Sequence, residues 1–198
     1  MLLALAIAGC ATAKPAPAVT GCSGDEQYIP RGTFPRDYPG SDEARRGWYS
    51  LSLLRMGEPS LACGDWQGAE AYRILWLNAL WHPVAIRVGR RGSEIELVAT
   101  QLSGIASADP GVILAQVRKT LPVSQWYRLT DAVRHSEFWS LPTSGNMYGL
   151  HGEQWVVEGR RGDAYHIVDR WSPGAGAYRD LGVLFFDLAG WQRPASAQ

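Results

Sequence analysis

Two stretches of the chain, residues 84–99 and 154–171, alternate apolar and polar side chains on either side of a glycine-containing turn. A two-residue period is typical of β-strands, and a turn between two such segments predicts an antiparallel hairpin. The chain must therefore form an antiparallel sheet that contains at least these two hairpins. The alternating apolar residues of the first stretch are Val84, Ile86, Val88, Ile95, Leu97 and Ala99.

Apolar residues recur at helical spacing in three other stretches, which predicts helices over residues 42–56, 124–139 and 177–191. Further strands are expected at residues 72–77 and 112–120. Each predicted helix needs a partner for its apolar stripe, and the sheet provides one. We therefore expect an α+β fold, with an antiparallel sheet built from β-hairpins and helices packed on one face.

The chain has 198 residues, of which 46% are hydrophobic, so it can close one sizeable core. We expect a single α+β domain over residues 41–193. Nineteen basic residues balance nineteen acidic ones, without a long run of one sign. This balance argues against nucleic-acid binding, which depends on a broad positive surface.

The chain begins with MLLALAIAGC, and Ile7 to Cys10 resemble the lipobox of bacterial lipoproteins. The resemblance implies that residues 1–9 are a signal peptide and that Cys10 becomes the lipidated N-terminus. Residues 10–40, rich in Pro, Gly and Ala, would then be a flexible tether to the membrane. Ala11 implies the periplasmic face of the outer membrane in that family. The alternative is an ordinary apolar terminus without export.

If Cys10 carries lipid, Cys22 and Cys63 are the only cysteines left. An oxidising cell envelope favours a disulfide between them. Closing that loop would stabilise the fold by about 4 kcal/mol on the chain-entropy model.

The second hairpin carries the candidate catalytic residues. If all its large apolar side chains share one face, a loop of about three residues centred on Gly162 places Glu158 opposite His166 on the other face. Arg170 lies on that face too. A carboxylate beside an imidazole is half of a general-base arrangement. A two-residue turn at Arg161-Gly162 would instead place Val157 opposite His166.

No nucleophile motif accompanies this group, so we expect a lipid-anchored envelope protein that is a binding or structural module without catalysis. The alternative is a small envelope hydrolase or transferase that uses Glu158, His166 and Arg170. Exposed aromatic residues such as Trp66 or Trp81 offer a third role, binding of an envelope protein or glycan partner.

No metal or other cofactor is expected, because the histidines lack metal-ligand spacing. His151, Glu153 and His166 could form a metal site only if the fold brings them together, because their spacing in the sequence does not indicate one. The histidines are His82, His135, His151 and His166.

Three motifs late in the chain resemble an uncharacterised bacterial protein family: FWSLP at 138–142, WVVEG at 155–159 and YHIVDRWSP at 165–173. The family patterns are FWxLP, WxxEG and YHxVxRWSP. Segments like its MGEPSL and LWL...HPVAIR stand upstream at 56–61 and 75–87. The resemblance covers about residues 45–191 and implies one domain, with no established activity to carry over.

Overall fold

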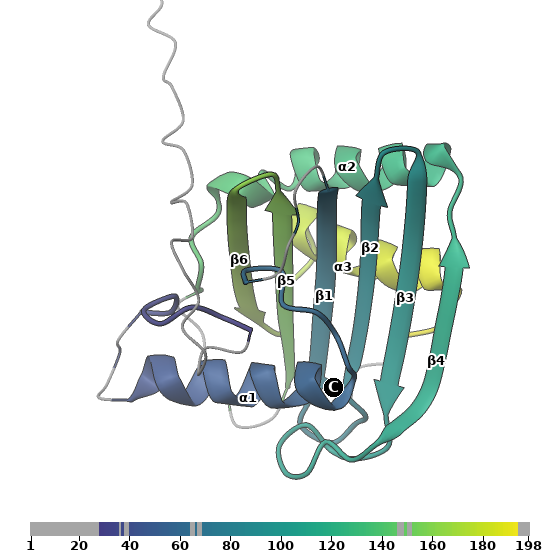
Figure 1. Ribbon diagram of the computed structural model, residues 1–198. Helices are drawn as coiled ribbons and strands as arrows, with labels where there is room; N and C mark the ends of the chain where they lie inside the picture. The colour runs from purple at the N-terminus through teal and green to yellow at the C-terminus, as the bar shows by residue number, and fades with distance from the viewer. Residues whose placement is uncertain are drawn as a thin grey trace, which may run out of the picture.

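The computed structural model describes residues 28–35, 37, 40–63, 66, 69–145, 149 and 152–193. Its strands form one antiparallel sheet in the order β4-β3-β2-β1-β5-β6 (Figure 1). None of the helices within these ranges combines the length and the apolar character that a membrane span requires. The elements are α1 (Ser41–Arg55), β1 (Ala69–Asn78), β2 (Val84–Arg91), β3 (Glu94–Leu102), β4 (Ile113–Thr120), α2 (Val123–His135), the short 3₁₀ helix η1 (Phe138–Ser140), β5 (Glu153–Arg161), β6 (Ala164–Trp171) and α3 (Ala177–Ala189).

Strand β1 is the centre of the sheet, because it pairs with β2 on one side and with β5 on the other. Short turns connect β1 through β3 in sequence, and β3 pairs with β4. The chain then runs through α2 and η1 to β5 on the far side of β1. This crossover brings residues 153–171 beside the first hairpins, although they are distant in sequence.

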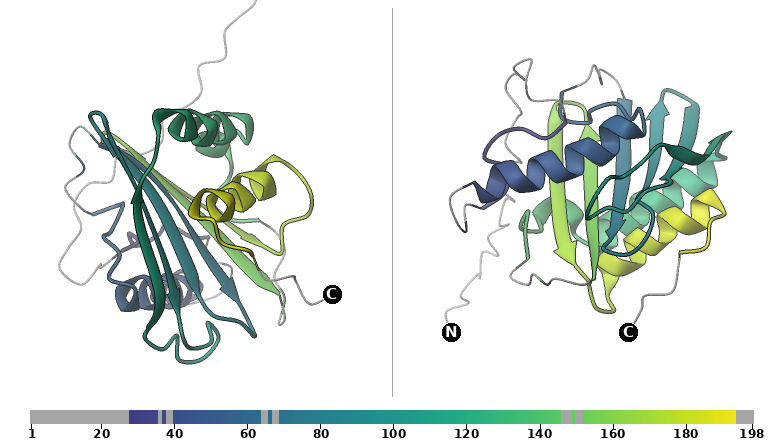
Figure 2. Two further views of the ribbon diagram at one scale, coloured as in Figure 1. Left: turned by 90° about the vertical axis from the view of Figure 1, so that its right-hand side faces the viewer. Right: turned by 90° about the horizontal axis from the view of Figure 1, so that it is seen from below.

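Helices cover both faces of the sheet (Figures 1 and 2). Helices α2 and α3 pack on one face, and α1 packs on the other together with the segment around Ile29 and Phe34. The predicted α+β class with an antiparallel sheet is confirmed. Two helices share a face as expected, while α1 takes the opposite one. The reason is that β1 is buried along nearly its whole length, so both of its faces need a cover.

The face under α2 and α3 is packed with apolar and aromatic side chains. Helix α3 comes close to the sheet at Gly182, where an added Cβ would lie 2.3 Å from the Trp155 ring. Glycine therefore sets the distance between α3 and β5. The sheet residues of this core include Tyr72, Ile74, Trp76, Val84, Ile86, Val88, Trp155, Val157 and Val168.

The predicted helices match the observed ones except at the end of the second. Helix α2 ends at His135, because Glu137 takes a left-handed conformation with φ of 52° and starts the separate turn η1. At the start of α1, the N-cap is Gly40, and Ser41 is the first helical residue.

Candidate functional site

The second hairpin turns more tightly than predicted. Arg161 pairs with Ala164, which leaves a two-residue loop of Gly162 and Asp163. Glu158 lies opposite Ile167, and His166 lies opposite Gly159. The predicted loop centred on Gly162 and the predicted Glu158–His166 pair are therefore both wrong.

The physical reason is that both faces of this hairpin are buried. Trp155 and Val157 face α2 and α3, whereas Tyr165 and Ile167 face α1. The predicted register assumed that all large apolar side chains share one face. Because both faces are covered, these side chains are divided between them. Glu158 consequently lies on the α1 face.

Glu158 is fully buried and holds two partners. Its Oε2 accepts hydrogen bonds from Arg73 Nε and Nη2 at 2.8 and 2.6 Å, and its Oε1 accepts one from the Tyr165 hydroxyl at 2.9 Å. Burial, and then the Glu158 charge, raise the pKa of Tyr165, so this hydroxyl stays protonated and donates. Both carboxylate oxygens are thus occupied, which leaves Glu158 no role as a base.

The same network continues to the turn after α1. Glu58 Oε2 accepts from Arg87 Nε at 2.8 Å and from Arg73 Nη1 at 3.3 Å, and the Pro59 carbonyl accepts from Arg73 Nη1 at 2.7 Å. Burial alone would lower the pKa of Arg73, but Glu158 and Glu58 together raise it. Two guanidinium groups face two carboxylates, so the buried charges balance.

His166 and Arg170 lie on the other face of the sheet and hold the segment after η1. The half-buried His166 ring packs 5.1 Å from the Phe138 ring, and its Nε2 lies 3.0 Å from the Leu141 carbonyl oxygen. Burial lowers the pKa of His166, so the neutral ring donates Nε2–H to that carbonyl. Arg170 donates to the Pro142 carbonyl at 2.9 Å.

The motifs that resemble a bacterial family therefore contact one another as parts of the core. Gly159 lies against Phe138, because an added Cβ would come within 2.7 Å of that ring. His166 and Arg170 bind the backbone of the FWSLP segment, and Glu58 and Glu158 bind the same arginine. The residues of these motifs therefore have a structural role, because their contacts stabilise the fold.

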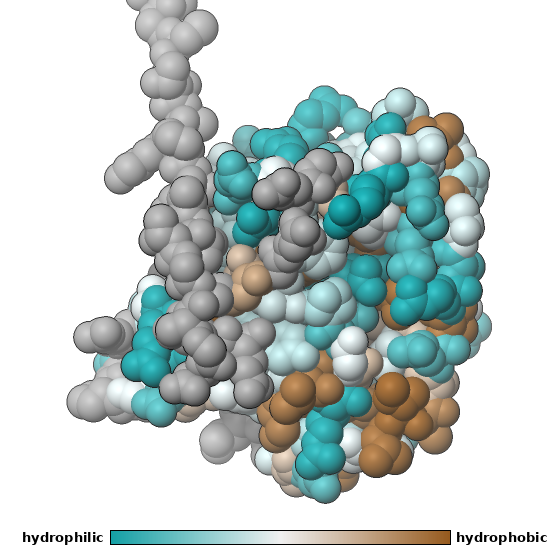
Figure 3. Space-filling model, viewed as in Figure 1, coloured by the Kyte–Doolittle hydropathy of each residue, from teal (hydrophilic) through white to brown (hydrophobic). Residues whose placement is uncertain are grey.

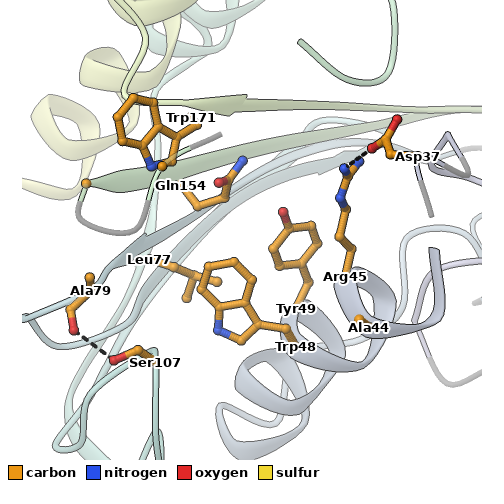
Figure 4. A pocket seen from close by; sticks show the side chains of 12 residues that line it. Asp37, Ala44, Arg45, Trp48, Tyr49, Leu77, Ala79, Ser107, Gln154 and Trp171 are labelled. Atoms are coloured by element: carbon orange, nitrogen blue, oxygen red, sulfur yellow. Dashed lines mark hydrogen bonds and ion pairs between the residues drawn. The ribbon is translucent and has the colours of Figure 1, made fainter. Parts of the chain in front are cut away.

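A cavity of about 540 Å³ lies between α1 and the sheet, where β1 and β6 end and β5 begins (Figure 4). The Trp48 and Trp171 side chains lie on opposite sides of it, with Gln154 between them and Tyr49 beside Trp48. The size is that of sites for small organic ligands. The lining residues are Asp37, Ala44, Arg45, Trp48, Tyr49, Leu77, Ala79, Ser107, Gly149, Gly152, Gln154 and Trp171.

A buried carboxylate, Asp169, orients the polar groups at the base of the cavity. Its Oδ2 accepts from the Tyr49 hydroxyl at 2.9 Å, and its Oδ1 accepts from Gln154 Nε2. Burial raises the pKa of Asp169 to about 6, against the lowering effect of the Tyr49 hydrogen bond. Because Gln154 donates to Asp169 through Nε2, its side-chain carbonyl remains as a hydrogen-bond acceptor at the cavity.

Both indoles are held in place. Trp48 Nε1 donates to the Ala106 carbonyl at 2.6 Å, which fixes its ring against the loop after β3. An added Cβ at Gly149 or Gly152 would come within 2.2 or 2.7 Å of the Trp171 ring, so the backbone lies directly against it. At the rim, Arg45 Nη2 contacts Asp37 Oδ2 at 2.5 Å. These contacts preorganise the cavity.

Of the remaining predicted site residues, some lie outside the residues that the structure describes and others lie within them. Cys63 is disulfide-bonded, and its predicted partner Cys22 lies outside the described residues, as do Cys10 and His151. Trp66 is partly buried and donates to the Ser60 carbonyl, whereas Trp81 is 47% exposed. Across the described ranges, no group of three or more His, Cys, Asp or Glu side chains could hold a metal ion.

No family model matches this chain, and no curated protein matches it. Membership in the family with FWxLP, WxxEG and YHxVxRWSP therefore stays a prediction. The cavity could not be predicted from the sequence, because its two indoles come from α1 and from the end of β6, which are far apart in the chain. The available signal was the density of tryptophans, which did not indicate which of them share a space.

Proposed function

We propose that this protein is a lipid-anchored binding module of the bacterial cell envelope, which takes a small ligand into the cavity between α1 and the sheet. The observation that carries the proposal is the preorganised pair of indoles, Trp48 and Trp171, with the side-chain amide of Gln154 fixed by Asp169 in the same cavity. Ligand sites are concave and mostly apolar, with a few convergent polar groups. The lipobox-like segment ending at Cys10 supports the anchor.

Exposed apolar side chains near the cavity support a position at a membrane. The loop after β1 contacts the loop after β3, through Ser107 Oγ to the Ala79 carbonyl at 2.9 Å. Figure 3 shows apolar surface along this lower edge of the molecule. Such surfaces are typical of interaction sites, and tryptophan suits the membrane interface. The exposed apolar residues of these loops and the start of β4 are Leu80, Trp81, Ile105, Val112, Ile113 and Leu114.

The alternative of a hydrolase or transferase is not favoured by the observed geometry. Its three candidate residues needed one shared surface, yet the sheet separates Glu158 from His166 and Arg170. Each of them is also engaged by neighbours that stabilise the fold. A binding role without catalysis needs none of them.

The anchor is tested by incorporation of labelled palmitate in cells. We expect the parent chain to take up label and to fractionate with membranes, and Cys10→Ala to lose both properties. Equal soluble export of the parent and of Cys10→Ala would exclude the anchor.

The cavity is tested with a variant that fills it. Ala44 lines the cavity from α1, so Ala44→Phe would occupy the space without removing a contact. A thermal-shift screen with saccharides, dipeptides, ammonium compounds and fatty acids should give at least one compound that stabilises the parent but not Ala44→Phe. Leu54→Phe adds the same ring at an exposed position on the same helix and should behave like the parent. Compounds that stabilise all three chains equally, or none at all, would exclude a binding function for this cavity.

A further inference from the structure

We infer that the ligand of this cavity is a neutral saccharide. The inference rests on the proposed binding function and adds the chemical class of the ligand. It depends on three properties of the cavity: flat aromatic walls, a mixture of hydrogen-bond donors and acceptors, and charges that are already paired.

The walls suit a ring with apolar faces. Trp48 and Trp171 lie on opposite sides of the cavity, and the Trp48 and Tyr49 rings are 5.3 Å apart (Figure 4). A sugar ring presents C–H groups on its faces and hydroxyl groups around its edge. Its faces therefore pack on indoles, while its edge remains available for hydrogen bonds.

The polar groups of the cavity match such an edge. The Gln154 side-chain carbonyl is an acceptor for a ligand, because the amide nitrogen of the same side chain is held by Asp169. The indole nitrogen of Trp171 is turned toward Gln154, which places a donor in the same region (Figure 4). Hydroxyl groups both donate and accept, so one ligand type satisfies this mixture. An acyl chain would bury the Gln154 carbonyl and the Trp171 indole N–H without offering either of them a hydrogen bond, at a cost in binding.

The charges around the cavity favour a ligand without net charge. Arg45 is paired with Asp37 at the rim, and its Nη1 also donates to Ser144 Oγ at 3.3 Å. Asp169 is only 2% exposed and is covered by Tyr49 and Gln154. A charged ligand would have to compete with the existing Arg45–Asp37 pair for a counterion, and it would lose its hydration. The paired charges therefore favour a saccharide over an ammonium compound, which aromatic walls alone would also accept.

The experiment is a calorimetric titration of the folded domain with N,N′-diacetylchitobiose and cellobiose, which are neutral disaccharides. Tetramethylammonium chloride and octanoate are the charged and apolar comparison probes. We expect saturable binding of at least one disaccharide, with a Kd between about 1 μM and 1 mM. We expect no saturable binding of the two comparison probes.

The variants assign the binding to the cavity. Trp48→Leu and Trp171→Leu should each weaken disaccharide binding about tenfold or more, in line with the loss of a central aromatic contact. Trp81→Leu removes an exposed tryptophan outside the cavity lining and should bind like the parent. If either leucine variant fails to fold, Ala44→Phe tests the same point without removing an indole.

The outcomes separate this inference from the proposed function. Disaccharide binding that is lost in Ala44→Phe supports both. Binding of tetramethylammonium or octanoate alone, again lost in Ala44→Phe, overturns the saccharide and leaves the binding function intact. Disaccharide binding that is unchanged in Ala44→Phe, Trp48→Leu and Trp171→Leu overturns the inference, because the sugar then binds elsewhere. Absence of saturable binding by any probe also overturns it.

Discussion

The two faces of the sheet are buried by different means. The face under α2 and α3 is closed by interlocking apolar and aromatic side chains. The face under α1 contains fully buried charged groups, among them Arg73 and Glu158, and also the cavity of about 540 Å³. The face under α2 and α3 also holds one buried carboxylate, Glu153, whose Oε2 accepts hydrogen bonds from the Trp76 and Trp155 indoles within the packed core. Both faces therefore stabilise the fold, but only the α1 face combines its charged network with the cavity for which we propose a binding role.

The largest effect is expected from breaking the charged network. Glu158→Ala leaves the Arg73 guanidinium without its closest counterion in a fully buried site. We expect a loss of about 3–5 kcal/mol in the free energy of unfolding, measured with urea. The double variant Arg73→Met, Glu158→Leu should lose less than Glu158→Ala alone, because no buried charge is left unpaired. Equal losses in the single and the double variant would contradict the role given to this pair.

The next effect depends on pH and concerns Asp169. Its pKa is raised from 3.8 to about 6 in the folded protein. Between these values the folded state binds more protons than the unfolded state, so stability contributed by this group falls as pH rises through about 6. Asp169→Asn cannot ionise and should avoid this loss, which is about 3 kcal/mol at most.

The measurement is urea unfolding of the parent and of Asp169→Asn at about pH 4 and about pH 7. The stability difference between the two chains should shift in favour of the variant at the higher pH. The other charged or titratable groups around Asp169 are Arg45, Arg170, Tyr49 and Tyr178, which both chains share. Asp131→Asn, at an exposed position, serves as the control and should show no such shift. A constant difference across this pH range would refute the raised pKa.

The smallest effects on stability are expected from two helical glycines, one on α3 and one on α1. Gly182→Ala on α3 should cost about 1–2 kcal/mol, since the new Cβ meets the Trp155 ring at 2.3 Å while helix propensity offsets part of the strain. Gly47→Ala on α1 meets nothing within 4 Å and should stabilise the protein by up to about 1 kcal/mol. Thermal unfolding measures both effects: the melting temperature should fall for Gly182→Ala and rise for Gly47→Ala. Destabilisation of equal size at both positions would show that the two helices do not differ in this way.

The positions of the helices and strands could be predicted from the sequence, but the register between strands and the face that each helix covers could not. Hairpins and helices follow from periodicity within a few residues, so residues 84–99 and 177–191 were interpreted correctly apart from two or three terminal residues. The register of β5 and β6 depends on what covers each face, and periodicity alone does not reveal that α1 covers the second one. The assumption that all large apolar side chains of this hairpin share one face therefore placed Glu158 beside His166.

The cavity was missed for the same reason. Its base depends on Asp169, which looks like an ordinary polar residue of an alternating strand until Tyr49 and Gln154 are brought against it. Trp171 was assigned to the core face with Trp155, although the observed register turns the two toward opposite faces. Sequence patterns identify residue types, and only the pairing of distant strands shows which of them meet.

The most direct test of the account follows the indole N–H signals by nuclear magnetic resonance while N,N′-diacetylchitobiose is added. Signals are assigned with single Trp→Phe variants. The account predicts shifts for Trp48 and Trp171 on the α1 face, with Trp76 and Trp155 on the opposite face unchanged. Shifts at Trp139, which lies beside His166, with Trp48 and Trp171 unaffected, would contradict it.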